Sequence, residues 1–227
     1  MDAAAIVGAA LRGSGLNLAA SCGIDAYDGR APRGFRSIDL MPRARGVVVV
    51  GSAGRDLWAE LRASSEGDPS FWTREHPLDT HVAGILDRAD LALAMAGIGS
   101  RRFEPTLTAS VAHGIDFRAL GELTGLGSMG PFGIVIHPVH GPWWALRGAW
   151  LVDVAVTEPT AFPAPCAGCH APCLGTARPE GILLATAIVR RRCIVGQDSR
   201  YGDEQIAYHY DPEPTLEKLR AHGSGQG

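Results

Sequence analysis

The run from Val47 to Val50, flanked by Gly46 and Gly51, constrains the fold of this chain more than any other segment. β-Branched residues favour extended backbone, and an uninterrupted apolar run has no polar face to turn toward water. The segment is therefore predicted to be a strand buried on both faces. Such a strand needs neighbouring strands and covering helices, so the sequence predicts an α/β or α+β fold.

Apolar spacing predicts the other elements. The pattern over 3–18 is helical but is interrupted by Gly13 and Gly15, and the long helix that opens at Pro77 has Asp79 or Thr80 as its cap. Further helices are expected at 57–63, 116–123, 204–210 and 215–222, and further strands at 134–136 and 143–156.

Composition limits the partners of this chain of 227 residues. The net charge is −3 without a basic block, which argues against nucleic acid, because phosphate binding needs clustered cations. No apolar run reaches the length of a membrane span, and no basic leader precedes an apolar one, so a cytoplasmic protein is expected. Composition changes at Thr157, and the chain is predicted to divide into an α/β domain, 1–156, and a Cys-rich segment with a C-terminal cap, 157–227.

The segment from Gly125 to Gly148 combines four features of a binding site. Glycines let the backbone approach a large flat ligand, a His-Pro pair leaves a strand at a fixed angle, paired tryptophans offer apolar surface, and an arginine can meet an anion. The candidate contacts are Gly127, Gly130, Gly133, Ile136, His137, Pro138, Gly141, Trp143, Trp144 and Arg147. Taken singly, these residues also suit a glycine-rich strand corner with core tryptophans.

The order of these residues along the chain, however, resembles that in the cobalamin-processing decyanase and dealkylase family. The family carries a glycine, Ile-His-Pro, a glycine turn and Trp-aromatic-Ala-aliphatic-Arg-Gly, which match Gly133, 136–138, Gly141 and 143–148. The segment is also similar to the epoxyqueuosine reductases over 124–127 and 137–143. The resemblance implies a flavin-reductase or nitroreductase-like fold, a mainly antiparallel sheet flanked by helices, and a bound corrinoid (cobalamin).

A second match lies in register with the first. Residues 200–208 resemble the decyanase string Arg-Tyr-Ser-Glu-Glu-Gln-Lys-Ala-Tyr, although an amphipathic surface helix also explains them. On that register Arg147 and Arg192 fall on family arginines associated with a glutathione-like thiol cosubstrate. The acidic string of epoxyqueuosine reductase is absent, which leaves His113 and Asp116 as candidate proton donors, and its tRNA activity is not carried over.

Cysteines depart from the decyanase pattern. Cys166, Cys169, Cys173 and Cys193 supply four thiols, and the first three have the spacing of a ferredoxin run. They predict a metal centre, either a single [4Fe–4S] cluster or a zinc site in which His170 replaces one thiol, with reactive thiols as the third alternative. Cys22 has no local partner and is expected in the core.

The sequence thus predicts a corrinoid-binding oxidoreductase that reductively removes or exchanges the upper ligand of cobalt. Its electrons would come from a cluster fed by an electron-donor protein, or a thiol would accept the ligand. Two alternatives stay open, a cobalamin chaperone without turnover and a flavin-dependent reductase with a structural metal. A homodimer is the candidate assembly.

Overall fold

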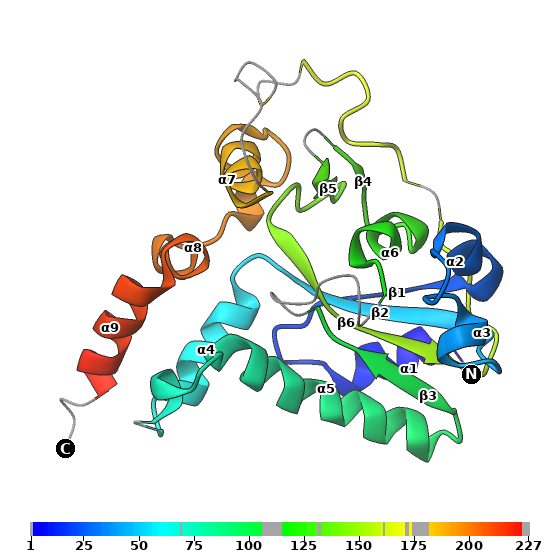
Figure 1. Cartoon of the computed structure of the whole chain (residues 1–227). Coiled ribbons are helices and arrows are strands. Elements are labelled where there is room, and N and C mark those ends of the chain that lie inside the picture. The colour runs from blue at the N-terminus through cyan, green and yellow to red at the C-terminus, as the bar shows by residue number, and fades with distance from the viewer. Residues whose placement is uncertain are drawn as a thin grey trace.

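A computed structural model describes residues 2–68, 70–105, 115–130, 133–160, 162–170, 173 and 182–223, with the backbone alone at 182–185 and 222–223. Its centre is a four-stranded sheet in the order β1-β2-β6-β3 (Figure 1). These strands span Leu18–Gly23, Gly46–Ala53, Trp144–Val152 and Ser100–Phe103. Every neighbouring pair is antiparallel.

The valine run forms the middle of β2, as predicted, and every residue of that strand is buried. Successive side chains of a strand point to opposite faces. Val48 and Val50 accordingly enter one hydrophobic cluster, and Val47 and Val49 enter another. The sheet therefore has a core on each side, which explains why the run shows no polar alternation.

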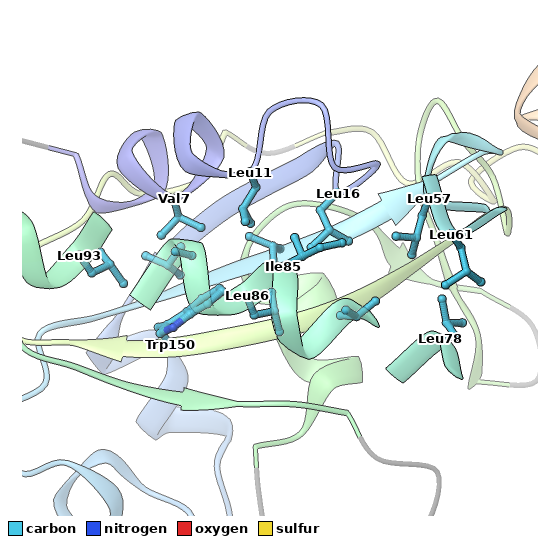
Figure 2. Packing of buried hydrophobic residues seen from close by; sticks show 14 of the residues in the cluster. Val7, Leu11, Leu16, Leu57, Leu61, Leu78, Ile85, Leu86, Leu93 and Trp150 are labelled. Carbon is cyan, nitrogen blue, oxygen red and sulfur yellow. The ribbon is translucent and has the colours of Figure 1, made fainter. Parts of the chain in front are cut away.

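Helices cover both faces. Three of them, α1 (Ala3–Ala10), α4 (Asp56–Ser65) and α5 (Pro77–Met95), pack on the Val48 side. Figure 2 shows their apolar side chains spread along this side of the sheet, with the fully buried Trp150 of β6 among them. The other side is covered by α2 (Ile24–Arg30), α3 (Ser37–Leu40) and α6 (Phe117–Leu123).

The remaining elements build one end of the molecule. A small hairpin joins β4 (Ser128–Met129) to β5 (Val135–Ile136), and α7 (Ile182–Arg192) lies beside it (Figure 1). The chain then forms a 3-10 turn, η5 (Gln197–Ser199), and the helices α8 (Asp203–Tyr210) and α9 (Pro212–Gly223). Contacts such as Arg220 Nε to the carbonyl of Trp72, at 2.9 Å, tie α9 back to η1 (Phe71–Thr73) after α4.

The predicted fold class is confirmed, with three local corrections. The strand expected over 143–156 ends at Val152. The helix expected over 3–18 ends at Ala10, because Gly13 and Gly15 adopt left-handed φ values of 76° and 77° and turn the chain into β1. The long helix begins at Pro77 itself, so Asp79 lies in its first turn and no side chain caps it. No helix among the described residues is long and apolar enough to cross a membrane.

Candidate functional site

The glycines of the β4–β5 hairpin have two different surroundings. A Cβ at Gly127 would lie 2.7 Å from Val135 Cγ1, and one at Gly130 would lie 2.6 Å from Ile136 Cγ1. These two glycines therefore let the hairpin pack closely. Gly133 has a left-handed φ of 76° and nothing within 4 Å of a Cβ built on it, and it lines a cavity. The open backbone that a flat ligand needs is thus found at Gly133.

His137 fixes the turn after β5. Its Nδ1 accepts hydrogen bonds from the backbone N–H groups of Val139, at 3.0 Å, and His140, at 3.1 Å. Burial lowers the pKa of His137 to about 4, and the nearby His140 adds to this effect. The ring is therefore neutral near pH 7, with its proton on Nε2, and it holds the His137–Gly141 turn from within.

A cavity of about 250 Å³ lies between the hairpin, the start of β6 and α7. Gly133, Ile134 and Val135 form one wall, and Trp144 forms another. The indole N–H of Trp144 donates to the Val135 carbonyl oxygen at 3.1 Å, which fixes the ring against the hairpin. The walls are largely apolar and partly backbone, as a planar ligand would require.

A second cavity, of about 600 Å³, lies on the far side of Arg190. Its lining includes Trp143, Arg191, Arg200 and Tyr210. Trp143 is buried, and its indole N–H has no hydrogen-bond partner within the described part of the chain. Buried donors are normally satisfied, and this nitrogen is covered by protein atoms, so it is an unsatisfied donor of the interior.

Arg190 lines both cavities and holds α7 in place. Its Nε donates to the Pro142 carbonyl oxygen at 3.0 Å, and Nη1 lies 3.2 Å from the hydroxyl of Tyr210. The guanidinium also stands over the rings of Tyr201, at 4.5 Å, and Trp143, at 5.6 Å. Aromatic faces stabilise a cation without neutralising it, so Arg190 keeps a charge available to a ligand.

Arg147 lies at a β-bulge, which changes the direction of its side chain. The register shifts between Gly51, opposite Leu146, and Val50, opposite Gly148, so Arg147 is the unpaired residue of a β-bulge. Its half-buried guanidinium donates from Nε to Ser52 Oγ at 3.2 Å. No carboxylate within the described ranges forms an ion pair with Arg147 or with Arg190.

The two arginines create a positive interior. Burial lowers the pKa of His209 to about 3, and the charges of Arg147 and Arg190 contribute to the shift. Burial likewise lowers the pKa of Arg147 itself. The Asp79 carboxylate opposes this effect on Arg147 but forms no ion pair with it within the described ranges. The two arginine charges therefore favour a carboxylate or phosphate group of a ligand in this region.

The four predicted cysteine ligands gather although Cys193 is distant in sequence. Cys173 is buried, and Cys166 and Cys193 pack with it against Ile136 and Val189. Burial raises the pKa of Cys166, and so do the other three thiols, of which Cys193 has the largest effect. The group lies directly behind the hairpin, since a Cβ at Gly130 would be 3.4 Å from Cys166 Sγ.

The arrangement of the four thiols can be compared with what a [4Fe–4S] cluster and a zinc ion require. No three His, Cys, Asp or Glu side chains among the described residues are arranged to hold a metal ion. Zinc requires four ligands within about 2.3 Å of one point, which this arrangement does not provide. A four-iron cluster takes one thiolate per iron. The described residues thus show a group of close thiols but neither of the two predicted metal centres.

Other predicted residues lie elsewhere. The Asp116 carboxylate caps α6 by accepting from the N–H groups of Arg118 and Ala119, so it has a structural partner. Arg192 is exposed at the end of α7, and His113 lies outside the described residues. Cys22 is fully buried in the core, as predicted, and burial raises the pKa of its thiol to about 12.

Arg190 is the residue that the sequence did not indicate. It belongs to a run of three arginines, and the family register pointed to the third, Arg192. Successive residues on a helix point about 100° apart, so only the phase of α7 decides which arginine enters the site. The burial of Val189, which is 1% exposed, does not identify Arg190, because Arg192, three residues further on, lies closer to the same face of the helix.

The fold is that of proteins that handle B12 and of epoxyqueuosine reductases. The chain is similar to CblC, a B12-trafficking protein of C. elegans and homologue of human MMACHC, with a TM-score of 0.64 and 13% identity over 99% of this chain and 97% of that one. It is also similar to epoxyqueuosine reductase from Streptococcus thermophilus, with a TM-score of 0.51 and 13% identity over 74% of this chain and 50% of that one.

A third structure, epoxyqueuosine reductase with a tRNA stem loop, gives a TM-score of 0.53 at 14% identity over 83% of this chain and 55% of that chain. The chain thus spans about half the length of the epoxyqueuosine reductases that it matches. No protein-family model and no curated protein matches the chain. The resemblance found in the sequence is therefore confirmed at the level of the fold.

Proposed function

We propose that this protein binds a corrinoid as its substrate and reductively removes or exchanges the upper axial ligand of the cobalt. The observation that carries the proposal is a pair of largely apolar cavities that share Arg190. The smaller one also has Arg118 in its lining, and the larger one has Arg191, Arg200 and Asp203. Ligand sites usually combine apolar walls with a few placed polar groups. A corrinoid has this character, because its flat ring carries amide and phosphate groups at its edge.

In the proposed complex the ring rests against Trp144 and the open backbone at Gly133. Arg190, which lines both cavities, supplies a charge for an amide or phosphate oxygen. A protein wall over an axial face of the ring excludes water from the metal, which favours loss of an upper ligand when the metal is reduced. The chain's own contribution is binding, orientation and the exclusion of water.

A thiol cosubstrate is the second part of the proposal. The arginine pair formed by Arg147 and Arg190 can hold the carboxylate of a glutathione-like thiol in charge-assisted hydrogen bonds. For an alkyl ligand, the sulfur would form a new S–C bond with the carbon while the Co–C bond breaks. The electron pair of that bond stays on cobalt, and the thiol proton leaves to solvent.

A single [4Fe–4S] cluster on Cys166, Cys169, Cys173 and Cys193 is the third part. When bound, such a cluster supplies electrons one at a time. Support comes from the position of the four thiols behind the β4–β5 hairpin, whose residues Gly133 to Val135 line the apolar cavity. The division into a corrinoid-binding domain, 1–156, and a metal-binding segment, 157–227, belongs to the same proposal.

The experiment is an anaerobic purification followed by incubation with cyanocobalamin or methylcobalamin, dithionite and glutathione. We expect loss of the upper ligand in the visible spectrum, with iron near four equivalents per chain for one [4Fe–4S] centre. Corrinoid binding without ligand loss would identify a chaperone, and a bound flavin with no corrinoid binding would identify a flavin-dependent reductase. Either result would refute the proposed activity.

A further inference from the structure

The outward face of α5 is apolar at its C-terminal end. Leu91 and Met95 lie one helical turn apart and are 62% and 81% exposed, and the exposed Ala94 lies beside them. Buried residues of the same helix, such as Leu86 and Leu93, enter the core on its other side. In Figure 1, α5 runs along the lower edge of the molecule, with the sheet above it. Large apolar side chains gain free energy when a partner covers them, so this end of α5 is a contact surface.

Gly84 leaves a hollow on the same face. It lies seven residues before Leu91, inside a helix of 19 residues, and it is exposed. A Cβ built on it would meet nothing within 4 Å. A glycine inside a helix costs about 1 kcal/mol relative to alanine, and no contact within the described part of the chain requires one here. Such a position lets a second helix approach closely, because no side chain separates the two backbones.

Two opposite charges lie between the hollow and the apolar end. Asp87 and Arg88 are adjacent in sequence, and both are exposed. Asp87 accepts from Arg102 Nη1 at 2.8 Å, yet 70% of its side chain is exposed, and Arg88 Nη2 donates to the Ala10 carbonyl oxygen at 2.6 Å. A face with one acid beside one base can pair with itself, because a two-fold axis brings each charge to the opposite charge of a second copy.

We propose that α5 docks against α5 of a second copy of this chain, with the two helices antiparallel and the two-fold axis beside Asp87 and Arg88. Gly84 lies three residues before Asp87, and Leu91 lies three residues after Arg88. The axis therefore places Leu91 of each copy over Gly84 of the other. Hollow, charges and apolar side chain meet their complements in this one arrangement, which favours a second copy over a partner of another sequence.

The size of the face sets the strength of the dimer. One helix from each copy provides less than the roughly 1,200 Å² that stable interfaces bury, so the dimer should dissociate on dilution. Exposed charge pairs are screened by salt, so salt should weaken it further. The dimer is independent of the proposed function, since the linings of the two cavities around Arg190 include no residue of α5.

The test is sedimentation velocity of the full chain over a series of concentrations. The first variant is Leu91→Glu, with Ile38→Glu as its matched control, because Ile38 is 64% exposed on α3, which covers the other side of the sheet. The second variant is Arg88→Glu, which sets carboxylates against each other across the axis. The exposed Arg33→Glu is its control for net charge.

A double variant tests the antiparallel register. Asp87→Arg combined with Arg88→Glu reverses both charges, so each would again meet its opposite across the axis. Arg102 keeps two acidic partners in this variant, Asp90 at 2.7 Å and Glu104 at 3.0 Å. Urea unfolding of every variant checks that the chain still folds.

We expect a wild-type dimer whose share rises with concentration and falls with salt. Leu91→Glu and Arg88→Glu should raise the dissociation constant about tenfold or more, and the two controls should stay within about twofold. The double variant should recover most of the affinity that Arg88→Glu loses. A wild-type chain that stays monomeric up to about 1 mM, or equal effects in test and control variants, would overturn the proposal. A double variant as weak as Arg88→Glu would overturn the antiparallel register.

Discussion

Arg147→Met separates the binding role of the positive interior from its effect on stability. Methionine keeps the apolar stem of the side chain and removes the charge. The guanidinium forms no ion pair within the described residues, although the Asp79 carboxylate acts on its charge, and its hydrogen bond to Ser52 is 3.2 Å long. Burying an uncompensated charge costs several kcal/mol, whereas the lost hydrogen bond is worth about 1.5–3 kcal/mol. We therefore expect unfolding free energy to be unchanged or to rise by about 1 kcal/mol.

Binding should change in the opposite direction. Loss of a charge-assisted contact of about 1.5–3 kcal/mol weakens the binding of an anion by roughly 10- to 150-fold. Urea unfolding measures the first effect, and calorimetric titration with glutathione measures the second. Arg147→Lys is the control, because it keeps the charge without the planar fork, and it should lose less affinity than Arg147→Met.

His209 reports on the same substitution without any ligand. Burial and the two arginines hold the pKa of His209 near 3, so removal of the Arg147 charge should raise it, as NMR titration of the imidazole would show. A Met variant that is destabilised by about 3 kcal/mol or more, as when a paired buried charge is broken, would refute the reasoning. So would unchanged glutathione affinity together with an unchanged His209 pKa.

Three further predictions concern the hairpin and the cysteines. The unfolded chain protonates His137 near pH 6.5, whereas the folded chain does so only near pH 4. The free energy of unfolding should therefore fall as the pH drops through this window, by at most roughly 3 kcal/mol. The variant His137→Asn keeps a hydrogen-bond acceptor, and its midpoint of urea unfolding should depend less on pH. Gly127→Ala should destabilise the protein by about 1–3 kcal/mol, because the new Cβ overlaps Val135. Gly133→Ala meets open space and should cost about 1 kcal/mol because of its left-handed φ. Equal losses of unfolding free energy in the two variants, measured with denaturant, would contradict this difference. Cys193→Ser should lower bound iron in metal analysis, and Cys22→Ser should not; iron unchanged in Cys193→Ser would remove Cys193 from the ligand set.

Local sequence signals predicted the central elements because their physical causes are local. The valine run can only be a buried strand, and the apolar spacing after Pro77 gave α5. The neighbouring strands were missed for the same reason. Leu18–Gly23 has mostly small residues, and Ser100–Phe103 has two arginines, so neither segment shows a β pattern of its own. Their pairing with β2 and β6 makes them strands.

The candidate site was predicted in part. The motif around His137 and Trp144 lies at a cavity beside the β4–β5 hairpin, and the cysteine spacing indicated thiols that the fold brings together. The sequence could not show that Gly127 packs against Val135 or that Arg190 stands between two cavities. Both facts depend on segments far apart in the chain, which local periodicity cannot relate.

Spectral titration of cob(II)alamin tests the central claim most directly. The corrinoid is held at a fixed concentration under anaerobic conditions while protein is added, and the same series is run with Trp144→Ala. We expect the spectrum to shift to the base-off form and to saturate near one corrinoid per chain, and we expect Trp144→Ala to require at least about tenfold more protein. A spectrum that does not change at high protein excess would contradict the corrinoid assignment.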